Sequence, residues 1–153
     1  MDLGREGDQL VEGKGGGEMS NWDHKFYKSS PAIEVFRENK RGDVIRLLRP
    51  MKYRWRGRVL TVPKGFECDG ASVPRFLWNS VSPQIDPRTL AGAIGHDFLY
   101  RRHPKTWTRA EADDFFYDLI REDGLSWWKA QKAYWGVRLF GGSAWDNGGN
   151  NAD

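Results

Sequence analysis

Four ionisable residues of this chain lie in three short segments whose neighbours are mostly apolar. The segments read CDGAS, GHDFLY and EADDFFY, in that order along the chain. The four residues are Asp69, His96, Asp97 and Asp113. Burying ionisable groups costs free energy unless they are paired, so such a cluster in apolar surroundings indicates a site with a chemical task.

Two kinds of chemistry fit these residue types. A carboxylate bonded to one ring nitrogen of a histidine fixes its tautomer and leaves the other nitrogen to accept a proton from water. His96 is therefore a candidate general base, and Asp113 is its candidate orienting carboxylate. Asp97 and Asp69 offer oxygen ligands, which a hard cation prefers, so they are candidate metal ligands with calcium as the cofactor.

Plainer interpretations stay open for each residue. His96 also fits a core histidine with satisfied hydrogen bonds, and Asp69 also fits an Asp-Gly turn. Asp97 also fits a buried carboxylate that bonds backbone NH groups or an arginine, with Arg75 and Arg109 as the candidates.

Two predicted helices position the cluster. Asp86-Pro87 is a typical helix start, and Pro104 prevents this first helix from continuing beyond about residue 102. The capping-box pattern at Thr108 starts a second helix that ends near Gly124. Because the connection between them is short, we expect an antiparallel pair, with Asp113 on the inward edge of its helix and within reach of the histidine.

The remaining elements complete an α+β pattern. Three strands are predicted at Asp43–Leu48, Met51–Trp55 and Arg58–Val62, with a tight turn between the last two, and a third helix runs from 126 to 141. The predicted fold is a small N-terminal antiparallel β-sheet followed by three helices, two of which form the antiparallel pair that carries the His/Asp cluster.

Length and composition bound the rest of the prediction. The 153 residues suit one domain at 21–145, between flexible termini at 1–20 and 146–153. The single cysteine excludes an internal disulfide, and a net charge of +3 spread along the chain argues against a specific nucleic-acid partner. Among the 8 tryptophans, Trp127, Trp128 and Trp135 are expected to pack inside rather than to form a lipid-insertion surface.

No segment of the sequence suits export or membrane spanning. The first residues are charged and glycine-rich, without the apolar region of a signal peptide, and no apolar run approaches the ~20 residues that cross a bilayer. We therefore expect a protein that is made in a cytoplasm and has no transmembrane segment.

Four motifs resemble a phage and prophage family, the domain of unknown function thirteen fifty-three. They are VPKGFECDGASVPRFLW, AIGHDFLYR, RAEADDFFYDLI and YWGVRLFG, and the resemblance covers about Val62 to Trp145. It implies a phage setting and a location in the virion, with other virion proteins as partners and a homo-oligomer within an assembly as an open alternative. It implies no particular reaction.

The helical motifs also resemble, more distantly, the small secreted A-two phospholipases of bacteria and fungi. That resemblance implies that His96 activates a water, that Asp113 orients it, and that Asp97 binds calcium with Asp69 from the CDGAS loop. The signal peptide and disulfides of those enzymes have no counterpart in this sequence.

The hypothesis is thus a phage-encoded virion, tail or lysis-module component with a calcium-dependent lipid ester hydrolase site, for which membrane lipid is the substrate. The alternative is a structural virion protein that keeps the helical pair for packing.

Overall fold

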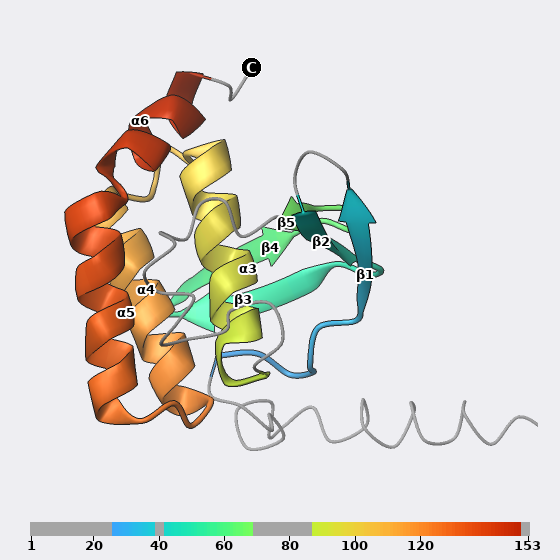
Figure 1. The fold of residues 1–153 in the computed structure, drawn as a ribbon, viewed down its shortest axis with the longest axis horizontal. Coiled ribbons are helices and arrows are strands. Elements are labelled where there is room, and N and C mark those ends of the chain that lie inside the picture. The colour runs from blue at the N-terminus through green and yellow to red at the C-terminus, as the bar shows by residue number, and fades with distance from the viewer. Residues whose placement is uncertain (1–25, 39–41, 69–86, 151–153) are drawn as a thin grey trace, which may run out of the picture.

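The computed structural model describes residues 26–38, 42–68 and 87–150 of the chain. Strands precede helices, so the predicted α+β class is confirmed (Figure 1). The elements in chain order are β1 (Ile33–Glu38), β2 (Gly42–Leu47), β3 (Met51–Trp55), β4 (Arg58–Val62), β5 (Glu67–Cys68), α3 (Pro87–Arg102), α4 (Arg109–Glu122), α5 (Trp127–Phe140) and α6 (Gly142–Asn150).

The strands form two small antiparallel units. One has the order β1-β2-β5, and the other is the β3–β4 hairpin. Arg56 and Gly57 connect the hairpin with positive φ angles of 47° and 76°, as a type I′ turn requires, so the predicted tight turn is confirmed. The sequence prediction missed β1 and β5. Strand β2, which was predicted at Asp43–Leu48, begins and ends one residue earlier than predicted.

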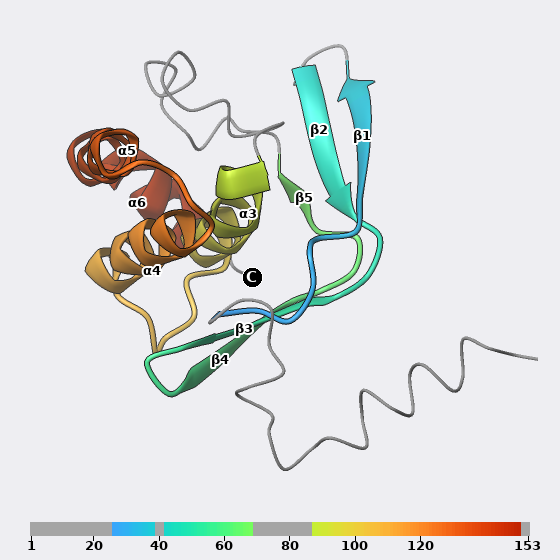
Figure 2. The same ribbon diagram turned by 90° about the horizontal axis from the view of Figure 1, so that it is seen from below.

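The helices form a layer beside the strands (Figures 1 and 2). Helix α3 lies between the β1-β2-β5 sheet and α4, α5 packs on α4, and the β3–β4 hairpin lies against both α3 and α4. The predicted capping box of α4 is present: the Thr108 side chain accepts a hydrogen bond from the Glu111 backbone, and the Glu111 side chain accepts one from the Thr108 backbone. None of the helices in the described ranges is long and apolar enough to cross a membrane.

Helix α6 follows the three predicted helices, and it includes residues 146–150, which the sequence prediction placed in a flexible tail. It packs against α3 so closely that a Cβ atom at Gly148 would clash with the Tyr100 carbonyl. The glycines that made this stretch look unstructured are therefore what allows the contact.

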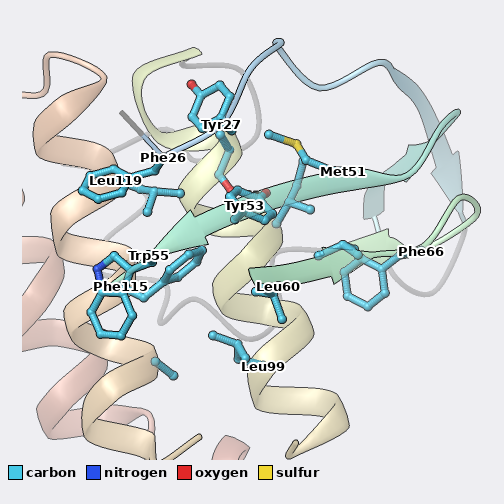
Figure 3. Close-up of a cluster of buried hydrophobic side chains, with 14 of the residues drawn as sticks. Phe26, Tyr27, Met51, Tyr53, Trp55, Leu60, Phe66, Leu99, Phe115 and Leu119 are labelled. Carbon is cyan, nitrogen blue, oxygen red and sulfur yellow. Dashed lines mark hydrogen bonds between the residues drawn. The ribbon is translucent and has the colours of Figure 1, made fainter. Parts of the chain in front are cut away.

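Aromatic rings from the hairpin and the helices form the core (Figure 3). Trp55 stacks on Trp107 with ring centroids 5.4 Å apart, and Phe115 meets Tyr53 edge-on at 5.3 Å. The Tyr53 hydroxyl donates a buried hydrogen bond to the Ala91 carbonyl of α3 at 2.6 Å. These contacts fix α3 and α4 relative to the hairpin.

The prediction that the tryptophans of α5 pack inside is wrong. Trp127, Trp128 and Trp135 are 48%, 73% and 54% exposed. The side of α5 that packs against the protein is formed instead by small and medium residues, which are Ala130, Ala133, Gly136 and Val137.

Candidate functional site

The structure brings His96 and Asp113 into direct contact. His96 Nε2 lies 2.8 Å from Asp113 Oδ1, and the two side chains are 2% and 0% exposed. His96 belongs to α3 and Asp113 to α4, which lie side by side (Figures 1 and 2). The contact expected from the helical positions is confirmed.

Asp113 is the centre of a larger hydrogen-bonded group. The Tyr100 hydroxyl donates to Asp113 Oδ1 at 2.6 Å, and Arg138 Nη1 from α5 donates to Oδ2 at 3.0 Å. Arg109 Nε lies 4.0 Å from Oδ2 and donates to the Tyr100 hydroxyl at 3.3 Å. The carboxylate, itself on α4, thus receives donors from two other helices, α3 and α5.

The ionisation of Asp113 follows from these partners. Burial is the largest influence and acts to raise its pKa, but the hydrogen bonds from His96, Tyr100 and Arg138 favour the charged form, and the pKa lies below its ordinary value of 3.8. Burial, and then the bond to Asp113, raises the pKa of Tyr100, so the phenol stays neutral and donates.

This ionisation state determines the tautomer of the histidine. An ionised carboxylate only accepts hydrogen bonds, so the proton between the two groups belongs to Nε2 of His96. In the neutral ring the other nitrogen, Nδ1, then carries the lone pair that can accept a proton.

Aromatic neighbours hold the imidazole ring in place. The ring centroid lies 4.1 Å from that of Tyr100 and 5.0 Å from that of Phe116. Tyr100 follows His96 by one helical turn, so both rings project from the same face of α3 toward α4. The histidine is thus fixed by packing as well as by its hydrogen bond.

Asp97 lies apart from this group, as predicted, and is 2% exposed. Its Oδ2 is 3.1 Å from Arg101 Nε, one turn further along α3. Arg101 is therefore an arginine partner of Asp97, whereas the candidate Arg109 lies near Asp113. The other candidate, Arg75, lies outside the described residues.

Of the two predicted calcium ligands, Asp97 is the one that lies in the described residues. Asp97 has the right ligand type, a buried carboxylate, but no group of three or more His, Cys, Asp or Glu side chains that could hold a metal is found among the described residues. The second predicted ligand, Asp69, lies outside the described residues. Calcium binding therefore stays a prediction.

The sequence interpretation missed two members of the group. Tyr100 was not assigned to the group, although its spacing of four from His96 places both on one helical face. Arg138 was not singled out, and no local pattern marks it, because its contact with Asp113 depends on how α5 packs against α4.

The fold and the site together define a class of small α+β protein with a buried His-Asp-Tyr-Arg group between helices. The model of the family described as "Protein of unknown function (DUF1353)" matches residues 45–137, which is more than half of the chain. The chain belongs to this family. The match extends from β2 to α5 and so includes the whole group except residue 138.

Two relatives from Sinorhizobium fredii (strain NBRC 101917 / NGR234) share part of the sequence. The chain is 31% identical to "Uncharacterized protein y4jT" over 80 residues, which are 52% of this chain and 23% of that protein. It is 33% identical to "Uncharacterized protein y4iH" over 78 residues, which are 51% of this chain and 32% of that protein. The match therefore spans less than a third of either relative. No solved structure matches the chain significantly.

Proposed function

We propose that the protein hydrolyses an ester bond of a phospholipid, with His96 as general base. The observation that carries the proposal is the buried bond of 2.8 Å between His96 Nε2 and an Asp113 carboxylate that two further donors orient. A histidine held in one tautomer with its second nitrogen able to accept a proton is the arrangement that general-base catalysis requires.

In this mechanism Nδ1 of His96 takes a proton from a water as the water attacks the ester carbonyl. Nε2 keeps its proton and its bond to Asp113, whose negative charge balances the imidazolium that forms. Tyr100 and Arg138 hold the carboxylate ionised and in place, which limits reorganisation during the reaction. The proton then passes from Nδ1 to the leaving alkoxide, and the ester becomes an acid and an alcohol.

Calcium is part of the proposal, with Asp97 and Asp69 as the residues that would hold it. When bound, it would polarise the ester carbonyl as a Lewis acid. Arg101 at 3.1 Å already balances the charge of Asp97. On binding the ion, the Asp97 carboxylate would have to release Arg101 or be shared between Arg101 and the ion.

The test is release of fatty acid from phosphatidylglycerol vesicles, measured with calcium and with a chelator. We expect turnover with calcium, reduced by about 10²–10⁴-fold in His96→Gln, because glutamine can donate to Asp113 but is not a base. His103→Ala is the control, since His103 lies one residue beyond the end of α3, where its ring contacts that of Trp145. Full activity in His96→Gln would refute the assignment.

A structural role is the second candidate, and the burial of the group favours it. His96 and Asp113 are almost fully enclosed and hydrogen-bonded to each other, as a polar group that fixes helix packing would be. This role predicts no turnover with any vesicle and a fold that tolerates His96→Gln.

For either role we propose a phage setting, as a virion, tail or lysis-module component in contact with other virion proteins. The support is the resemblance of the four sequence motifs. Mass spectrometry of purified particles tests it, and absence of the chain from particles would leave only the lysis-module setting.

A further inference from the structure

Helix α5 presents an apolar stripe on the side that faces away from the protein. At ~100° per residue, Trp128, Lys132, Trp135 and Leu139 fall on one line, opposite the buried alanines. Trp128, Trp135 and Leu139 are 73%, 54% and 69% exposed. A surface helix normally directs polar residues outward, so this stripe indicates a surface with a partner.

The charge on α5 has one sign. Between Trp127 and Phe140 the helix contains Lys129, Lys132 and Arg138 and no acidic residue. Arg138 points inward to Asp113, so the two exposed lysines supply the outward charge. The outer face therefore combines indole rings, aliphatic side chains and ammonium groups.

We propose that this face of α5 binds the surface of a lipid bilayer that carries anionic lipids. Indole rings favour the boundary between headgroups and acyl chains, and lysines reach from an apolar surface to anionic headgroups. At about 1.5 Å per residue, the 14 residues of α5 span about 21 Å, short of the ~30 Å hydrocarbon core, so the helix lies on the bilayer.

The positive charge disfavours a second copy of the chain as the occupant. Two stripes paired about a twofold axis would place the Lys132 side chains of both copies within one largely apolar contact. An anionic lipid surface meets the same lysines with opposite charge. The inference rests on the proposed function for its purpose, which is to bring lipid to the enzyme, but binding is measurable without turnover.

The test uses the full chain and sedimentation with vesicles of ether-linked lipids, which contain no carboxylic ester to cleave. We expect binding to vesicles of phosphatidylcholine with phosphatidylglycerol, weaker binding to phosphatidylcholine alone, and weaker binding at high salt. Trp128→Ser/Trp135→Ser should lower the affinity at least about tenfold. The matched control is Val35→Ser/Val59→Ser, which removes two exposed apolar side chains, each 56% exposed, from β1 and β4.

Two further variants keep the result interpretable. Leu139→Ser replaces the tryptophan variant if that variant loses its circular dichroism, and Lys129→Glu/Lys132→Glu should abolish the preference for anionic vesicles. Unchanged affinity in these variants overturns the inference. A wild-type dimer that becomes monomeric in the tryptophan variant, without vesicle binding, would make a second copy the occupant.

The two proposals fail separately. If the protein binds ether-linked vesicles through the stripe but releases no fatty acid from ester-linked vesicles, the membrane-binding proposal stands and the enzymatic proposal is refuted. If the protein releases fatty acid and substitutions in the stripe change neither release nor binding, the enzymatic proposal stands and the membrane-binding proposal is refuted.

Discussion

At the scale of single residues, Asp113 is the group on which the site depends. It is fully buried, and His96, Tyr100 and Arg138 each donate to it. Removing one member of such a buried group leaves the charges of the others unpaired in the interior. The resulting loss of stability is larger than the net stability that the intact group contributes.

Asp113→Asn should therefore lower the free energy of unfolding by about 3 kcal/mol near pH 7. Because the folded-state pKa of Asp113 lies below its ordinary value of 3.8, its stabilising contribution is present above that value and is lost as the pH falls through the folded-state pKa. Urea unfolding at pH 7 and at pH 3 checks this, and the gap between wild type and variant should narrow at pH 3. Asp114→Asn, one residue away and partly exposed, is the control.

Tyr100→Phe removes one donor and leaves the ring in place. We expect a loss of about 1.5–3 kcal/mol in unfolding free energy, as for a hydrogen bond to a charged group. If the proposed mechanism is right, kcat should also fall under conditions in which the variant remains fully folded. A variant with wild-type stability would show that Arg138 and His96 alone satisfy the carboxylate.

The sequence predicted the contact between His96 and Asp113 because each residue lies on the inward side of a recognisable helix. The same reasoning gives Tyr100 once the four-residue spacing is considered. Arg138 is different, because it lies 25 residues further along the chain than Asp113, on another helix, and the direction of its side chain depends on tertiary packing.

At the scale of elements, α3 is placed by glycines that allow close packing. A Cβ atom at Gly95 would lie 2.6 Å from Phe115 Cε1 and 3.3 Å from Tyr53 Cζ. Both rings belong to the packed core, so neither can move aside without disturbing other contacts.

Gly95→Ala should therefore destabilise the protein by about 1–3 kcal/mol, despite the better helix propensity of alanine. Thermal unfolding measures the effect, with Gly142→Ala as control because its nearest atom would be 3.5 Å away. Equal melting temperatures in both variants would show that α3 shifts freely against α4.

The helices α3, α4 and α5 were predictable because capping residues and prolines mark their ends. Strand β1 was missed because its burial pattern does not alternate, and all its hydrogen-bonded neighbours in the described ranges are on β2. Helix α6 was missed because its glycines and asparagines lower helix propensity, and tertiary contact with α3 compensates.

At the scale of the whole molecule, the fold class follows from the order of strand-like and helix-like patterns. The exposure of the α5 tryptophans does not, because periodicity shows that a helix has an apolar face but not which face meets the protein. Small residues packed against α4, leaving the large rings outside.

One guanidinium links the helical layer. Arg109 at the start of α4 donates through Nη2 to the Val137 carbonyl at 2.9 Å and to the Arg138 carbonyl, and through Nε to the Tyr100 hydroxyl of α3. Both carbonyls lie in the last turn of α5, and that of Val137 also accepts the Gly141 backbone NH.

Such a link makes local fraying of one helix costly for its neighbours. We expect the slowest backbone amides of α3, α4 and α5 to exchange with deuterium at a common rate, through a single opening reaction. In Arg109→Lys, which keeps the charge but loses the forked geometry, amides in the last turn of α5 should exchange earlier than those of α4.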